Sequence, residues 1–92
     1  MSLVFEWDED KDVNNYIKHG VSFNEAKTVF NDIFSITIYD PAHSIDEDRY
    51  IDIGLSSHGR LIVVSYTERR DKIRIVSCRK ATKMEYAYYE KK

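Results

Sequence analysis

The spacing of the apolar residues changes near residue 32, and this change constrains the fold more than any other feature of the sequence. Between residues 23 and 30, apolar residues recur every three or four positions, which is the spacing of a helix face. From residue 34 onward they alternate with polar residues or form short apolar runs, which is typical of β-strands. We therefore expect helices to precede a sheet.

Three helices are predicted from their end signals. Asp8 is a suitable N-cap for a helix that runs to about Lys18, and Gly20 can end it in the left-handed conformation. Ser22–Glu25 and Thr82–Glu85 have the spacing of capping boxes, which predicts a second helix and a C-terminal one. The residues expected on the three buried faces are Val13, Tyr16 and Ile17, then Phe23, Ala26, Val29 and Phe30, then Met84, Tyr88 and Tyr89.

The alternating segments predict the sheet. Strands are expected over residues 3–5, 34–38, 49–55, 61–67 and 72–78, with hairpin turns at 56–59 and 68–71. The 61–67 segment is so apolar that we place it at the centre. The expected fold is a single α+β domain over residues 1–92, in which an antiparallel meander sheet carries two N-terminal helices and one C-terminal helix.

Charge is distributed unevenly along the chain. Residues 1–48 hold eleven acidic and three basic residues, and residues 49–92 hold eleven basic and five acidic ones. The net charge of −2 therefore hides a polarised chain. Two interpretations stay open. Either the basic half binds a polyanion, or the two halves neutralise each other within the fold.

Basic residues of the last two strands could converge at one end of the sheet. Arg74 alternates with apolar neighbours and so points away from their face. Arg79 follows the predicted strand, where its side chain can reach across the sheet end. Arg60 and Arg69 flank the neighbouring strand. Because guanidinium groups bind phosphate bidentately and keep their charge, this arrangement favours a phosphate-containing partner.

Aromatic residues support the same interpretation, but they also permit another. Tyr50 and Tyr66 are close enough in sequence to this cluster to stack on bases. The alternative is that Tyr66 belongs to the core and that the arginines pair with the carboxylates of Asp52, Glu68 and Asp71.

Metal and cofactor motifs are absent from the sequence. His19, His43 and His58 stand far apart, and we interpret the acidic 40–48 segment as a solvated loop. Cys78, the single cysteine, is expected to be a buried, inert thiol. We expect no metal and no cofactor. No segment has the length of a membrane span or the pattern of a signal peptide, so we expect a cytoplasmic protein with no membrane partner.

A series of motifs follows in order along nearly the whole chain. The first part holds Phe5-Glu6-Trp7-Asp8 and the block Lys18-His19-Gly20-Val21-Ser22-Phe23. The middle holds Asp40, His43-Ser44, Glu47, Arg49 and Gly59-Arg60. The last part holds Thr67-Glu68-Arg69, Ile73-Arg74-Ile75, Arg79 and Ala81-Thr82. In these residues the sequence resembles the BrnT family, the small toxins of type II toxin–antitoxin pairs.

The resemblance implies a fold like that of the RelE ribonuclease toxins and cleavage of RNA that inhibits translation. It also implies a cognate antitoxin, usually of the ribbon-helix-helix type, which neutralises the toxin in a hetero-oligomer. Together the two proteins would bind operator DNA. The alternative is a non-catalytic partner with the toxin fold, which acts as a co-repressor with a DNA-binding antitoxin.

The resemblance also implies roles for individual residues. The RNA 2′-hydroxyl would attack the neighbouring phosphate without a metal, assisted by cations, a base and an acid. By analogy with RelE-like toxins, Arg74 and Arg79 are expected to hold the phosphate. His19 is expected to act as the acid or base, the alternative being a helix C-terminal residue favoured by the dipole. The residues expected to bind the substrate are Arg60, Arg69, Lys18 and Tyr66.

Overall fold

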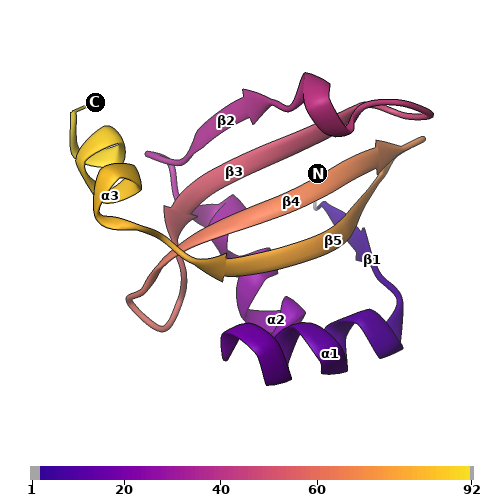
Figure 1. Cartoon of the computed structure of the whole chain (residues 1–92), viewed down its shortest axis with the longest axis horizontal. Coiled ribbons are helices and arrows are strands. Elements are labelled where there is room, and N and C mark those ends of the chain that lie inside the picture. Colours follow the sequence, from indigo (N-terminus) through magenta and orange to yellow (C-terminus); the bar gives the residue numbers. More distant parts are fainter. Residues whose placement is uncertain (1–2, 92) are drawn as a thin grey trace.

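A mixed five-stranded sheet is the scaffold of the molecule (Figure 1). The computed structural model describes residues 3–91. The strands are β1 (Val4–Glu6), β2 (Ile36–Tyr39), β3 (Arg49–Leu55), β4 (Leu61–Arg69) and β5 (Lys72–Lys80), in the order β1-β5-β4-β3-β2. The predicted antiparallel meander is confirmed for β2 to β5, with β4 at the centre. The sheet differs from the predicted antiparallel arrangement at its first strand, because β1 pairs with β5 in parallel.

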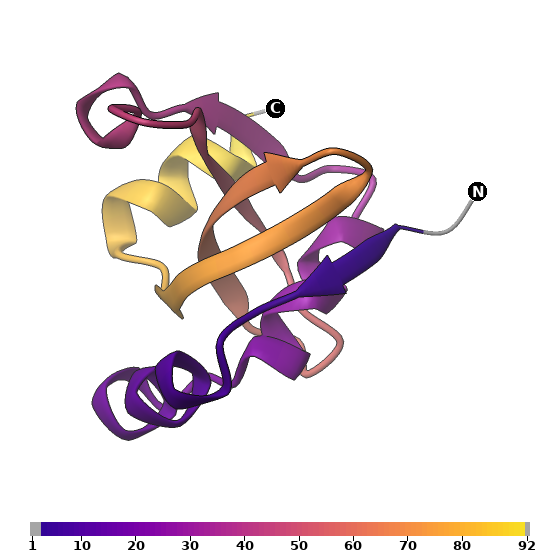
Figure 2. The same cartoon turned by 90° about the vertical axis from the view of Figure 1, so that its right-hand side faces the viewer.

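The helices lie on different sides of this sheet. α2 (Phe23–Ala26) and the 3₁₀ turn η1 (Lys27–Asn31) pack against one face. α1 (Glu9–His19), α3 (Lys83–Glu90) and the turn η2 (Pro41–His43) project toward the other side (Figure 2). We call this second side the open face. Directly paired residues share a face, so the open face carries Arg49, Ile51, Ile53, Val63, Ser65, Thr67, Arg74, Ser77 and Arg79.

The main core lies between the sheet and α2. As predicted, Phe23, Ala26 and Val29 are fully buried, and they pack on apolar residues of β4 and β5. A second, smaller core of Ile53, Leu61 and Val63 lies on the open side, beneath part of α3. Removal of this apolar surface from water is the main favourable contribution to folding.

Most of the predicted helix ends are confirmed. The Asp8 carboxylate accepts hydrogen bonds from the backbone of Asp10 and Lys11, and Gly20 ends α1 with φ 72°. Thr82 and Glu85 form a complete capping box at α3. The Ser22–Glu25 box is only half formed: the Ser22 hydroxyl accepts from the Glu25 N–H, but the Glu25 carboxylate hydrogen-bonds Arg60 and Ser56 instead of capping α2.

The buried face predicted for α1 is wrong. Val13, Tyr16 and Ile17 are 57%, 58% and 77% exposed, and the buried residue of this helix is Asn15. The reason lies in the sheet edge: β1 ends opposite Arg74, so the rest of β5 has no strand on its outer edge, the edge away from β4. Asn15 takes the place of that strand, since its side chain donates to the Cys78 carbonyl (2.9 Å) and accepts from the Cys78 N–H (3.1 Å).

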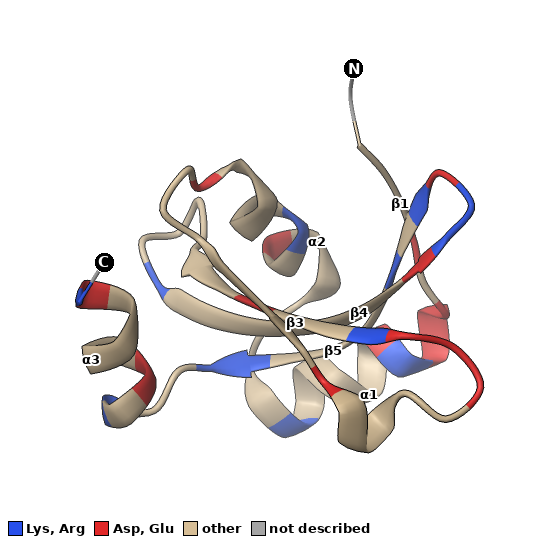
Figure 3. Ribbon diagram, turned by 90° about the horizontal axis from the view of Figure 1, so that it is seen from above, with Lys and Arg blue, Asp and Glu red and all other residues tan. Residues whose placement is uncertain are grey.

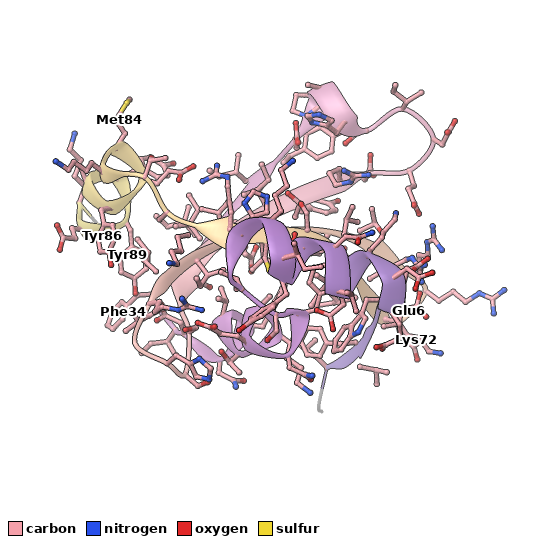
Figure 4. The ribbon with its side chains drawn as sticks, turned by 60° about the horizontal axis from the view of Figure 1, so that its bottom comes forward. Glu6, Phe34, Lys72, Met84, Tyr86 and Tyr89 are labelled. Carbon is pink, nitrogen blue, oxygen red and sulfur yellow. The ribbon has the colours of Figure 1, made fainter. Side chains whose placement is uncertain are left out.

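The buried face predicted for α3 is confirmed in only one residue. Tyr89 packs on the smaller core and donates a hydrogen bond to Asp32 (2.5 Å). Met84 is 84% exposed and projects outward from α3 (Figure 4), and Tyr88 is about half exposed. The helix is therefore held to the sheet mainly through one aromatic residue and its capping residues.

The hydrogen bonds of Asn15 to the edge of β5 lead to a prediction about stability. Asn15→Ala leaves the Cys78 N–H and C=O buried without partners, and we expect a loss of about 2–4 kcal/mol in the free energy of unfolding. Asn14→Ala is the matched control, because Asn14 is exposed on the same helix, and its effect should stay within about 0.5 kcal/mol. Urea denaturation followed by circular dichroism measures both. Equal stability of the two variants would refute this role for Asn15.

Candidate functional site

A β-bulge sets which side chains of β5 reach the open face. Tyr66 pairs with Ile75, but Ser65 pairs with Ser77, so β5 carries one extra residue, Val76. Arg74 and Arg79 are five positions apart, and in a regular strand they would point to opposite faces. The extra residue shifts the alternation of side chains between the two faces by one position. Arg74 and Arg79 therefore project from the same face, on which their partners are Thr67 and Val63.

The two arginines share this face but do not meet at one end of it, which corrects the expectation of convergence. Their partners on β4 are four residues apart, or about 13 Å at 3.3 Å per residue. Basic residues are accordingly spread along β5 and the β4–β5 hairpin rather than gathered at one rim (Figure 3). Arg79 also lies within β5, not after it as predicted, because the strand extends to Lys80.

Each of these arginines faces a carboxylate. Arg74 lies 3.5 Å from Glu6, its neighbour on β1, and both side chains are partly exposed. Arg79 makes two 2.8 Å hydrogen bonds to the carboxylate of Glu85 in α3. This bidentate pair is the main cause that lowers the pKa of Glu85 to about 2. The fork of Arg79 is thus already arranged to hold a planar oxyanion.

Two further predicted residues lie beside β5. Lys18 and His19, at the end of α1, line a shallow hollow of about 240 Å³ together with Lys11 and with Val76 and Ser77 of the bulge. Lys18 is exposed and His19 is half-buried. Because Ser77 stands on the open face between Arg74 and Arg79, the hollow borders the same surface.

Arg60 lies elsewhere and is engaged in the fold. Its guanidinium binds the side chain of Glu25, which is 2% exposed, through Nε and Nη2, and Nη2 also donates to the Gly20 carbonyl. Arg60 is the main cause that lowers the pKa of Glu25, against the raising effect of burial. Arg60 therefore joins the start of β4 to α2 rather than standing beside Arg74.

The other two predicted substrate-binding residues also have partners within the fold. Arg69 forms two hydrogen bonds to Glu47, 3.1 and 2.8 Å long, at the far end of β4. Tyr66 is 5% exposed and donates its hydroxyl to Asp52, as the core interpretation expects. Burial raises the pKa of Tyr66 above its ordinary value, and a ring in this position has no free face for a base.

Sequence reasoning missed Arg49 as a site residue. Among the described residues no ion pair engages Arg49, and its Nε is buried without a hydrogen-bond partner. Thr67, directly opposite on β4, is 1% exposed, and its Oγ1 also has no partner. Arg74 follows in the same row on β5. Unsatisfied buried polar atoms are uncommon, and together they mark this row as a candidate for binding a ligand.

Two chemical classes of site receive no support from the described residues. Burial raises the pKa of the Cys78 thiol to about 12, which agrees with the prediction of an inert buried cysteine. Between residues 3 and 91, no three His, Cys, Asp or Glu side chains are grouped so that they could hold a metal ion. None of the described helices is both long and apolar enough to cross a bilayer.

The charge polarity of the chain is partly neutralised within the fold. The ion pairs of Arg60, Arg69 and Arg74 all join the basic second half to a glutamate of the acidic first half. None of the arginine pairs predicted with Asp52, Glu68 or Asp71 forms; the glutamates used are Glu25, Glu47, Glu6 and Glu85. Charge alone therefore does not establish a polyanionic partner.

The structural role of Arg60 generates a second prediction. Arg60→Ala leaves the buried Glu25 carboxylate without its main partner, and we expect a loss of about 3 kcal/mol in unfolding free energy. Arg69→Ala breaks only an exposed pair and should cost less than about 1 kcal/mol. Thermal and urea denaturation at pH 7 compare the two variants. The assignment fails if Arg60→Ala is as stable as Arg69→Ala.

Comparison with known proteins adds to this geometry. The family model for "Ribonuclease toxin, BrnT, of type II toxin-antitoxin system" matches residues 7–85. The fold is similar to the crystal structure of the Brucella abortus ribonuclease toxin BrnT, with a TM-score of 0.65 and 22% identity over 89% of this chain and 100% of that chain. A search of the curated proteins finds no match. Because the family model spans most of the sequence, the chain belongs to the BrnT family of ribonuclease toxins of type II toxin–antitoxin systems.

Proposed function

We propose that this protein is a metal-independent endoribonuclease that cleaves RNA on the open face of its sheet. The observation that carries the proposal is the bulge at Val76, which places Arg74 and Arg79 on one face, with the hollow of Lys18 and His19 beside Ser77 between them. Family membership supports RNA as the substrate class. The two arginines, separated by about 13 Å along β4, would bind an extended strand rather than a single phosphate.

The proposed reaction needs only side chains and the RNA itself. A base takes the proton of a 2′-hydroxyl, whose oxygen attacks the adjacent phosphorus, and the bond from phosphorus to the 5′-oxygen breaks. An acid gives a proton to that oxygen. The products are a 2′,3′-cyclic phosphate and a 5′-hydroxyl. Guanidinium groups offset the charge that develops on the phosphate oxygens, and His19 is a candidate for proton transfer.

The carboxylates that face the arginines would give way to RNA. The Arg74–Glu6 pair is long and partly exposed, so it contributes little to stability and costs little to break. Glu85 holds Arg79 in the geometry that a phosphate would use, which makes it a competitor within the chain. RNA, with many phosphates, competes through the release of its counterions.

The biological role that we propose follows the RelE-like toxins. Cleavage of RNA in the cytoplasm would inhibit translation, and a cognate antitoxin of the ribbon-helix-helix type would neutralise the toxin and bring the complex to operator DNA. Type II membership supports an antitoxin partner. Expression of the chain alone should arrest growth, and co-expression of the antitoxin should restore it.

The catalytic proposal is tested with two adjacent residues of β5. Arg79→Ala should lower kcat/KM for RNA cleavage about 100-fold, because it removes a charged donor that holds a phosphate of the bound strand. Lys80→Ala removes an equal charge from the opposite face, where Lys80 pairs with Ile62, and should change it less than about threefold.

Cleavage of a labelled oligoribonucleotide, with and without EDTA, measures both variants. EDTA should have no effect on the wild-type rate. Equal losses in the two variants, or cleavage that stops with EDTA, would contradict the proposal.

Competition by Glu85 is tested separately. Glu85→Gln removes the negative charge but keeps an oxygen that can accept the Thr82 N–H, so the helix cap is retained. We expect it to tighten binding of a non-cleavable 2′-O-methyl RNA by up to about fivefold at low salt, with the gain disappearing at high salt. Fluorescence anisotropy gives the dissociation constants. Unchanged or weaker binding by Glu85→Gln would show that Glu85 does not compete.

A further inference from the structure

A histidine–aspartate pair that has no role in the site described so far lies at the rim of the open face. His43 Nδ1 is 2.8 Å from Asp40 Oδ2, in the segment between β2 and β3. A carboxylate only accepts hydrogen bonds, so Nδ1 donates to Asp40, and in the neutral ring this leaves the lone pair on Nε2. No described residue hydrogen-bonds that Nε2, and the His43 side chain is 66% exposed. The imidazole is therefore oriented and able to accept a proton.

The segment that carries the pair is tied to β3. The Ser44 hydroxyl donates to the Asp40 carbonyl (2.6 Å) and accepts from the Arg49 N–H (2.8 Å), and the Asp40 N–H donates to the Arg49 carbonyl (2.8 Å). These bonds fix the position of Asp40 relative to Arg49. The pair thus belongs to an ordered loop held against the first residue of β3, rather than to a freely solvated segment.

His43 and Arg49 line the same hollow, of about 270 Å³. Asp46 and Glu47 are the other charged residues on its wall. The Glu47 carboxylate is bound by Arg69, and its pKa is lowered first by this hydrogen bond and then by the charges of Arg69, Arg49 and Arg74. The hollow is smaller than sites of about 300–1,000 Å³ that enclose a free ligand, so it suits one linkage of a longer chain.

Arg49 is the side chain that could hold that linkage. It has no ion pair among the described residues, and Thr67 and Arg74 follow it in one row across the open face. With adjacent strands about 4.8 Å apart, the Cα atoms of Arg49 and Arg74 are separated by about 10 Å. Two long guanidinium side chains can reach a common phosphate across this distance.

We infer that His43 is the general base of RNA cleavage, that Asp40 positions its imidazole, and that Arg49 binds the scissile phosphate. This inference rests on the proposed ribonuclease function. His43 Nε2 takes the proton of the 2′-hydroxyl, the new O2′–phosphorus bond forms, and the bond to the 5′-oxygen breaks. That oxygen receives its proton from a separate acid. No oxidant, metal or other co-reactant is consumed.

The test uses full-length protein and a labelled oligoribonucleotide. His43→Ala should lower kcat about 100-fold or more, with KM little changed, and added imidazole should restore part of the rate. Asp40→Asn should lower kcat at least about tenfold while His43 is still present, because the imidazole loses its orientation. Circular dichroism and the melting temperature check that both variants fold.

His58→Ala is the matched control. His58 is also exposed, at 63%, and also lies beside a carboxylate, with Nδ1 3.2 Å from Glu25 Oε1, but Glu25 belongs to α2 on the other side of the sheet. Its removal should leave kcat within about twofold of wild type. A substrate with sulfur at the 5′-bridging position separates base from acid, because a thiolate leaves without a proton. The sulfur substrate should not rescue His43→Ala.

Each outcome decides the inference. Cleavage by the wild type together with normal kcat in His43→Ala overturns it and leaves the proposed function standing. Rescue of His43→Ala by the sulfur substrate also overturns it, since His43 would then be the acid. Absence of any cleavage by folded wild-type protein overturns the inference and the proposed function together.

Discussion

The extra residue in β5 is the constraint on which the rest of the candidate site depends. Without the bulge at Val76, a strand with Arg74 on the open face would carry Arg79 on the face that packs against α2. With it, apolar Ile75 and Cys78 both reach the main core while the two arginines share the open face. The one-residue shift in side-chain alternation therefore buries the apolar side chains of β5 and places its two arginines on the open face. Asn15 hydrogen-bonds the edge of the same strand.

The same kind of side chain serves two purposes in this molecule. Arg60 forms an ion pair with a buried glutamate and joins two parts of the fold, so its charge is neutralised within the structure. Arg74 and Arg79 face partly exposed carboxylates, which we propose that a phosphate replaces, and Arg49 forms no ion pair among the described residues. Burial of the carboxylate partner, rather than the number of positive charges, distinguishes the structural Arg60 from the candidate binding residues Arg74 and Arg79. It also explains how a chain with a net charge of −2 can present a basic row on its open face, where we propose that RNA binds.

Local signals in the sequence predicted the elements well. Asp8, Gly20 and the Thr82–Glu85 box act as caps, and the alternation after residue 32 yields the meander with β4 at its centre. The sequence pattern did not predict interactions between segments that lie far apart along the chain. The bulge is visible only in the pairing of β4 with β5. The parallel pairing of β1 with β5 joins two segments that lie far apart along the chain. The Glu25 carboxylate binds Arg60 instead of completing a capping box, because a buried carboxylate is stabilised more by a charged partner than by a backbone N–H.

The candidate site was predicted in part for the same reason. The sequence pointed to Arg74 and Arg79, but it placed them together at one sheet end. It left open whether Tyr66 belongs to the core, and it did not identify Glu25 as the partner of Arg60. Arg49 and His43 match the family motifs, but the sequence did not indicate a role in the site for either residue. The orphaned Nε of the one and the Asp40 contact of the other appear only in three dimensions.

The most direct test of this account maps where RNA binds. NMR spectra of arginine side-chain N–H groups, recorded during titration with a non-cleavable 2′-O-methyl RNA, report each guanidinium separately. We expect the signals of Arg49, Arg74 and Arg79 to shift together and saturate with one dissociation constant, while that of Arg60 stays in place. Shifts at Arg60 and Lys80 without shifts at Arg49 and Arg74 would place the nucleic acid on the wrong side of the sheet and contradict the account.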